Sequence, residues 1–81
     1  MKTLSELKIG ERARLAKIGG QGEIHKRLVD MGMVPGATLA VERIAPFGDP
    51  LDVKVRGFHL SLRKSEAALL QVVSLEDGAN S

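Results

Sequence analysis

The amino-acid sequence predicts a mainly β fold, in which about five short strands form a small barrel with one inserted helix and short helical turns. The clearest observation is an alternation of apolar and polar residues through 51–55 and again through 58–62, the period of strands with one buried face. A second observation is the length: 81 residues without cysteine leave a small core with no disulfide to stabilise it. A closed sheet would compensate for the small core, because it buries one face of every strand.

The two alternating segments predict a hairpin with a defined register. Arg56-Gly57 between them suits a two-residue turn, which pairs Val55 with Phe58. This pairing places six apolar residues on one face: Leu51, Val53, Val55, Phe58, Leu60 and Leu62. A slip of one residue would expose all the apolar side chains of one strand, so we expect this register and a core position for all six.

The first third of the chain predicts a helical turn, a strand and a flexible link. The spacing of Thr3 and Glu6 matches a capping box, which indicates one helical turn. Residues 12–18 begin with an alternation that favours a strand. The glycine-rich segment 19–22 follows as the link.

The one substantial helix is predicted by Ile24, Leu28 and Met31, which recur at i, i+4 and i+7 and form a single apolar stripe. Gly32 is placed to end this helix in the left-handed conformation. Residues 34–37, Val-Pro-Gly-Ala, then fit a type II turn. The chain should therefore reverse sharply into a strand over 38–44.

After the hairpin, we expect Ser65 to cap a short helical turn over 66–68, followed by a last β-rich segment over 70–75. About five short strands around one core suggest an SH3-like barrel, with the helix inserted between the first two strands. We expect residues 1–75 to form a single domain and the polar residues 76–81 to form a flexible tail.

The composition limits the expected cellular location of the protein and the kinds of partner it binds. The 12 basic and 10 acidic residues give a formal charge of +2, a mixed surface that does not by itself indicate nucleic-acid binding. No run of about 20 apolar residues could span a membrane, and the N-terminus lacks the apolar stretch of a signal peptide. We therefore expect a cytoplasmic protein with no membrane insertion.

The sequence contains no pattern that indicates catalysis or a cofactor. It has no serine–histidine–aspartate arrangement and no phosphate loop, and the glycine-rich link lacks the Lys-Ser/Thr that such a loop needs. His25 and His59 are the only histidines, each expected at the surface and without paired carboxylates. We expect a non-enzymatic protein with no cofactor and no metal site.

Two loop-forming blocks carry a family resemblance. The first is a basic residue and two aliphatic residues that lead into a Gly-Met-x-Pro-Gly turn, over 27–36. The second is Ala-Pro-Phe-Gly-Asp-Pro, over 45–50. Both resemble the FeoA family of bacterial ferrous iron transport accessory proteins, whose fold is SH3-like.

The resemblance implies a partner. It would be a FeoB-type ferrous iron permease, contacted at its cytoplasmic G-protein or membrane-proximal region, and nucleotide hydrolysis and iron translocation would belong to that permease. This chain would act as an adaptor that binds and modulates it.

A helix beside a small barrel should form a groove that such a partner could occupy. The candidate partner-binding residues are Leu28, Met31 and Met33 at the helix end, with Pro46 and Phe47 as the rim. Leu28, Met31 and Met33 could instead all pack inward, and Phe47 could do so as well. We expect Asp49 to hold its loop through an Asx-type bond rather than to contact anything else.

Two other functions stay open at the level of sequence. One is a regulatory SH3-like module, as in metal-dependent repressors, that senses metal or binds a peptide. The other is a KOW-like RNA or ribosome binder, suggested by residues 9–22 and by the basic outward face of the hairpin, Lys54, Arg56, His59 and Arg63. An uncapped sheet edge could also support weak self-association.

Overall fold

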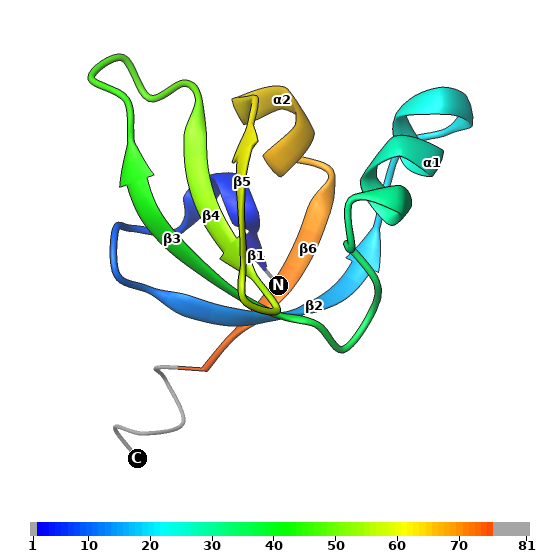
Figure 1. Cartoon of the computed structure of the whole chain (residues 1–81), viewed down its shortest axis with the longest axis horizontal. Helices are drawn as coiled ribbons and strands as arrows, with labels where there is room; N and C mark the ends of the chain where they lie inside the picture. Colours follow the sequence, from blue (N-terminus) through cyan, green and yellow to red (C-terminus); the bar gives the residue numbers. More distant parts are fainter. Residues whose placement is uncertain (1, 76–81) are drawn as a thin grey trace.

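The computed structural model describes residues 2–75, which form one antiparallel sheet curled around a single core (Figure 1). The strands are β1 (Lys2–Thr3), β2 (Arg12–Ile18), β3 (Thr38–Ile44), β4 (Leu51–Val55), β5 (Phe58–Leu62) and β6 (Leu70–Ser74). Their order across the sheet is β1-β6-β2-β3-β4-β5. The prediction of a mainly β fold is confirmed; residues 76–81, predicted to be a flexible tail, lie outside the described residues.

Three short helical segments complete the chain: η1 (Leu4–Glu6), α1 (Gly22–Asp30) and α2 (Lys64–Ala67). Helix α1 is inserted between β2 and β3, as predicted, and lies to one side of the barrel, whereas α2 lies near one end of it (Figure 1). The capping box at η1 is also confirmed, since Glu6 Oε2 accepts the Thr3 backbone N–H at 2.9 Å.

Strand β1 was not predicted from the sequence. Its two residues pair with β6, Lys2 opposite Val72 and Thr3 opposite Gln71. A two-residue strand is too short to show an alternation, so no pattern could have predicted it. The sheet therefore has six strands rather than about five.

The β4–β5 hairpin has the predicted register, with Val55 opposite Phe58 and Leu51 opposite Leu62. Arg56 and Gly57 both have positive φ, +52° and +91°, as a type I′ turn requires. One expectation was wrong: Phe58 is 72% exposed and Leu60 is only half-buried. Phe58 is on the apolar face, but it lies at the tip of the hairpin, where the other elements do not cover it.

The end of α1 follows the prediction closely. Gly32 has φ +100°, and the N–H groups of Gly32 and Met33 donate to the carbonyls of Val29 and Leu28, both at 3.0 Å. These bonds make a Schellman motif, which ends the helix at a fixed place. The next turn is also confirmed, with Gly36 at φ +94° and Ala37 N–H bonded to the Val34 carbonyl at 3.0 Å.

This turn is tied to strand β2. Gly36 N–H donates to the Leu15 carbonyl at 2.7 Å, and Leu15 N–H donates to the Ala37 carbonyl at 2.8 Å. The two bonds hold the chain that leaves α1 against the sheet. The position of the helix end is thus set by backbone hydrogen bonds at least as much as by side-chain packing.

The core is built from the inward faces of the strands, supplemented by η1, α1 and the turn after α1. Its largest fully buried side chains are Leu4, Leu15, Leu28, Met33, Leu39, Leu51, Leu62, Leu70, Val41, Val53, Val55 and Val72. Full burial of an aliphatic side chain stabilises a fold by roughly 1.5–3 kcal/mol. Leu28 and Met33 therefore serve to attach α1 and the following turn to the barrel.

Helix α2 is capped differently from the prediction. Ser65 is exposed and is not the cap; instead, Glu66 Oε1 accepts the Arg63 backbone N–H at 2.9 Å. Asp49 also differs, because its Oδ1 accepts the Lys64 backbone N–H at 3.0 Å and so joins the β3–β4 loop to the start of α2. Local sequence spacing cannot predict this second bond, since its partners are 15 residues apart.

Candidate functional site

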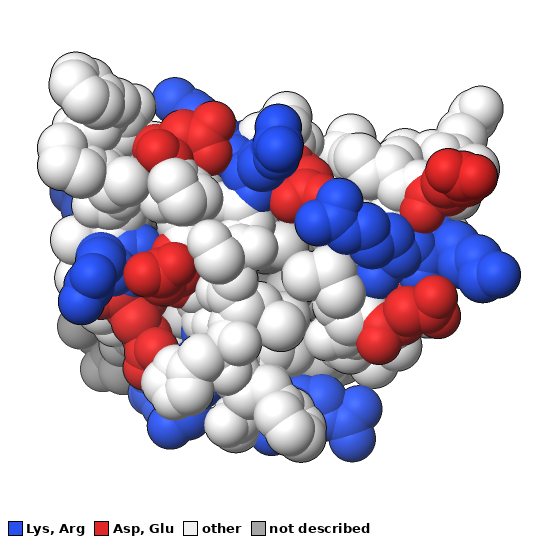
Figure 2. All heavy atoms as spheres, turned by 45° about the horizontal axis from the view of Figure 1, so that its top comes forward, with Lys and Arg blue, Asp and Glu red and all other residues white. Residues whose placement is uncertain are grey.

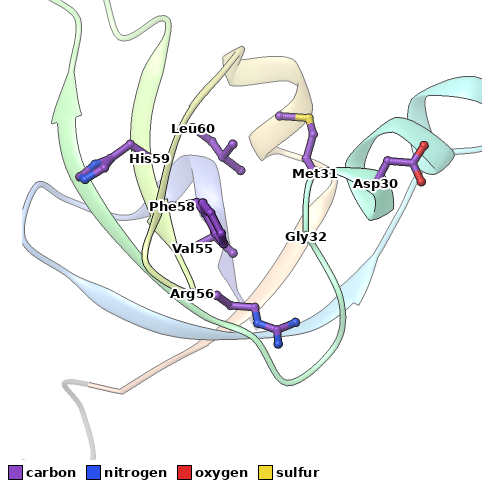
Figure 3. Close-up of a pocket in the computed structure, with 8 residues that line it drawn as sticks. All are labelled: Asp30, Met31, Gly32, Val55, Arg56, Phe58, His59 and Leu60. Atoms are coloured by element: carbon purple, nitrogen blue, oxygen red, sulfur yellow. The ribbon is translucent and has the colours of Figure 1, made fainter.

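A cleft of about 530 Å³ lies between the end of α1 and the β4–β5 hairpin (Figure 3). Its lining residues are Asp30, Met31, Gly32, Val55, Arg56, Phe58, His59 and Leu60. One wall is thus the helix terminus and the glycine that ends it, and the other is the hairpin tip. The cleft exists because the Schellman turn directs the chain back to β2 instead of over the hairpin.

The floor and walls of the cleft are mainly apolar. Met31 and Leu60 are half-buried and extend toward each other from opposite walls, and Phe58 lies beside Val55 at the lower end (Figure 3). Gly32 contributes no side chain, and nothing lies within 4 Å of where its Cβ would be. The cleft is therefore open at the end of the helix.

Charged groups mark the edges of the cleft. Asp30 lies at the helix side and Arg56 at the hairpin side (Figure 3). His59 points away from the cleft, toward β3, where its Nδ1 lies 2.7 Å from Glu42 Oε1. On the face shown in Figure 2, basic and acidic side chains are interspersed around a central area of other residues.

A second, more polar hollow of about 420 Å³ lies farther along β5. It is lined by Arg27, Asp49, Pro50, Ser61, Arg63 and Glu66. Within it, Arg27 Nη1 lies 3.0 Å from Glu66 Oε2, and the Glu66 side chain is only 3% exposed. This buried carboxylate was not predicted from sequence, because a glutamate in a short polar segment looks like a surface residue.

The structure separates the residues predicted to form one partner-binding groove. Leu28 and Met33 are 0% exposed, so a partner could not contact their side chains in this structure, and their place in the predicted groove is corrected. Met31 does line the cleft. Pro46 and Phe47 are exposed in the β3–β4 loop, Phe47 at 98%, but they are not part of the cleft lining.

Phe58 is the exposed aromatic of the cleft, and it was not predicted as a site residue. It was assigned to the core because it continues the apolar alternation of β5. Its place directly after the turn was the available signal, since the end of a hairpin often projects past the core. The rim of the cleft is therefore Phe58 rather than Phe47.

Among residues 2–75, neither a metal-binding cluster nor a membrane-spanning helix is found. Between residues 2 and 75, no three or more histidine, cysteine, aspartate or glutamate side chains cluster closely enough to hold a metal ion. No helix in the same range is long and apolar enough to cross a membrane. What the cleft does present is exposed apolar surface with charged edges, which suits the binding of another polypeptide.

Fold and cleft together define a class: a small SH3-like β domain with one helix beside the barrel and an apolar cleft between them. Residues 2–74 match the model of the FeoA domain, and the chain belongs to the FeoA family. This family takes part in ferrous iron transport. The resemblance seen in the two loop-forming blocks is thereby confirmed.

Similar structures support the fold. The solution structure of FeoA from Chlorobium tepidum is 42% identical, with a TM-score of 0.84, over 90% of this chain and 70% of that one. The zinc complex of FeoA from Stenotrophomonas maltophilia, described as a prokaryotic SH3 domain protein, is 31% identical, with a TM-score of 0.80, over 90% of this chain and 91% of that one. The SH3-like prediction is therefore confirmed.

A curated relative adds a connection to a transporter. It is the Fe(2+) transport protein A/Fe(2+) transporter FeoB fusion protein of Porphyromonas gingivalis, 36% identical over 78 residues. The match covers 96% of this chain but only 9% of the relative. In that protein, a domain similar to this chain is thus part of the same polypeptide as a FeoB transporter.

Proposed function

We propose that this chain is a non-enzymatic cytoplasmic accessory protein that binds and modulates a FeoB-type ferrous iron permease. The observation that carries the proposal is the P. gingivalis fusion, in which a similar domain and a FeoB transporter are joined in one chain. A fused domain is held permanently beside its transporter, and a separate chain needs a binding surface to reach the same position. Nucleotide hydrolysis and iron translocation would remain with the permease.

The cleft beside α1 supplies a surface of the right kind. Phe58 is 72% exposed and borders a hollow of about 530 Å³ into which Met31 and Leu60 extend. An exposed aromatic next to an apolar hollow is typical of residues that contribute most to binding energy. Methionine adds a flexible side chain that adapts to the shape of a ligand.

The binding should be weak and reversible. The cleft is small, and interfaces at the low end of the size range are usually transient. A membrane-held permease presents its cytoplasmic region at high local density, which offsets weak intrinsic affinity. Such binding suits modulation better than permanent assembly.

The test is an NMR titration of the ¹⁵N-labelled chain with the cytoplasmic G-protein domain of the ferrous iron permease from the same host, with and without a GTP analogue. We expect shifts at Met31, Phe58 and Leu60. A difference in these shifts with and without the GTP analogue would show that binding depends on the nucleotide state of the permease. Unshifted signals at high concentrations of a longer cytoplasmic fragment would contradict the proposal.

The two alternative functions gain no specific support. In the KOW-like interpretation, a turn and a strand should follow the glycine-rich link, but α1 begins there at Gly22. On the basic face of the hairpin, His59 is already paired with Glu42. For the repressor-like role, residues 2–75 contain no helix pair for binding DNA beside the barrel.

A further inference from the structure

We infer that the free edge of β5 receives an extended segment of the partner as an added strand, with an apolar side chain of that segment in the cleft beside α1 and acidic residues at its ends. The inference deepens the proposed function and rests on it. It specifies which backbone groups bind, what the bound segment looks like and which amides should respond.

Strand β5 is the last strand of the sheet, with β4 on one side only. Residues that flank a two-residue turn form a hydrogen-bonded pair, and such pairs alternate along an antiparallel ladder. Phe58, Leu60 and Leu62 therefore direct their backbone groups to β4. The backbone N–H and C=O groups of His59 and Ser61 point away from the sheet.

No backbone group in the described part of the chain forms a hydrogen bond with those outward groups. Neither His59 nor Ser61 makes a backbone hydrogen bond to a loop, a turn or another element within residues 2–75. Both residues are exposed. An edge with two unpaired N–H groups and two unpaired C=O groups is a template for another extended chain.

The apolar cleft and the polar hollow both lie along this edge. The apolar cleft includes Phe58, His59 and Leu60, and the polar hollow includes Ser61 and Arg63. Helix α1 and its C-terminal end contribute the opposite wall in each case, through Asp30 and Met31 in the first and Arg27 in the second. The five residues of β5 span about 17 Å, which matches an extended segment of about five residues.

Two basic side chains indicate which residues the bound segment should carry at its ends. Arg56 precedes β5 and Arg63 follows it; both are exposed, and neither is in an ion pair within residues 2–75. The carboxylates beside Arg63 are engaged elsewhere, Glu66 with Arg27 and Asp49 with the Lys64 N–H. Two unpaired cations at the ends of the strand favour a segment with acidic residues on both sides of its apolar one.

The same charges disfavour a second copy of this chain as the occupant. Antiparallel pairing of two β5 strands about Leu60 would place Arg56 of one copy opposite Lys64 of the other. Like charges directly opposite each other in a sheet are destabilising. A partner of different sequence avoids this repulsion.

The decisive pair of variants is Ser61→Pro and Ser61→Ala. Proline removes the outward N–H of residue 61 and is tolerated on an edge strand, where that N–H faces solvent. Alanine keeps the N–H and removes only the hydroxyl group. The probe is the cytoplasmic region of the FeoB-type permease of the same host, measured by isothermal titration calorimetry.

We expect Ser61→Pro to weaken binding by about tenfold or more, the loss of one good hydrogen bond to an ordered strand. Ser61→Ala should bind like the wild type, and thermal unfolding by circular dichroism should show both variants folded. Equal binding by the two variants would overturn strand addition while leaving the proposed function intact. Failure of the wild type to bind would overturn the proposed function, and strand addition with it.

Amide hydrogen exchange provides a readout that does not depend on the proline variant. The amides of His59 and Ser61 should become protected when the permease region is added, whereas the amide of Phe47, which lines neither the cleft nor the polar hollow, should not. Unchanged exchange at His59 and Ser61 in a saturated complex would contradict the inference. Protection that rises with the concentration of this chain alone would assign the edge to a second copy and overturn it as well.

Discussion

Arg27 Nη1 lies 3.0 Å from Glu66 Oε2, and this ion pair joins helix α1 to helix α2. The second oxygen of Glu66 accepts the Arg63 backbone N–H at 2.9 Å, so both oxygens of a carboxylate that is only 3% exposed are occupied. A buried charge is tolerated when it is paired and hydrogen-bonded. The pair therefore fixes the wall of the polar hollow that α1 provides.

Removing the Arg27 cation alone should lower the free energy of unfolding more than neutralising both partners of the ion pair. Arg27→Met leaves the Glu66 carboxylate buried without its ion pair, which should lower the free energy of unfolding by about 3 kcal/mol. The double variant Arg27→Met/Glu66→Gln should lose less than the sum of the single changes, because the amide carries no charge to leave unpaired. Urea unfolding of all four proteins measures the coupling.

Lys26→Met is the matched control for this cycle. It removes an exposed cation of the same helix that has no ion pair within residues 2–75, so stability should change by less than about 0.5 kcal/mol. Simple additivity of the Arg27 and Glu66 substitutions would show that the two side chains are not coupled in solution.

The two phenylalanines distinguish the cleft from the β3–β4 loop as the binding surface. Phe58→Ala should weaken permease binding by about tenfold, the effect of removing an aromatic that anchors an interface. Phe47→Ala removes the same number of atoms from a side chain that is 98% exposed and lies outside the cleft, and it should leave binding unchanged. Calorimetric titration of both variants, each first shown to unfold like the wild type, makes the comparison. If Phe47→Ala weakened binding and Phe58→Ala did not, the β3–β4 loop predicted from the sequence would be the binding surface.

Sequence patterns predicted the parts of the fold that depend on local rules. The hairpin register at Val55 and Phe58, the left-handed Gly32 and the type II turn at Gly36 all follow from period and backbone conformation. These features need only neighbours a few residues apart. For the same reason, the segments that became β2 and β3 could be placed correctly.

The site was harder to predict because it depends on contacts between distant segments. Met33 was a candidate for the core or for the groove, and Phe58 was assigned to the core, but the three-dimensional arrangement buries Met33 and exposes Phe58. Glu66 looks like a surface residue until Arg27, 39 positions earlier in the chain, is brought beside it. Periodicity assigns a side chain to a face, but it does not show where the core under that face ends.

Leu28 in α1 and Met31, which directly follows that helix, should respond in opposite ways to truncation. Leu28 is 0% exposed, and Leu28→Ala should lower the free energy of unfolding by about 2–5 kcal/mol through lost burial and the cavity left behind. Met31 is half-buried at the cleft, so Met31→Ala should reduce permease binding more than stability. Urea unfolding and calorimetric titration of both variants give the two readouts. A Leu28→Ala protein as stable as the wild type would mean that α1 is not packed on the barrel in solution.

Glu6 and Glu11 should make the fold sensitive to acid. The Lys8 backbone N–H, which donates to Glu11 Oε1 at 3.0 Å, lowers the pKa of that carboxyl, and Lys2 and Ser74 act in the same direction. The Thr3 backbone N–H and hydroxyl lower the pKa of Glu6 in the same way. Both carboxylates are hydrogen-bonded at the N-terminal end of the fold, and Glu11 joins it to β6 through Ser74.

The sign of the pH dependence follows from these lowered pKa values. A group whose pKa is lower in the folded state stabilises the fold above its unfolded pKa, about 4.3 for glutamate, and loses that contribution as the pH falls through the folded value. The midpoint of thermal unfolding should therefore decrease as the pH falls below about 4.3, and Glu11→Gln should flatten this decrease, because glutamine does not titrate. Glu23→Gln is the control, since that carboxylate has no hydrogen bond or ion pair within residues 2–75. If Glu11→Gln retained the full wild-type slope, the hydrogen bonds to Glu11 would not be the source of the acid sensitivity.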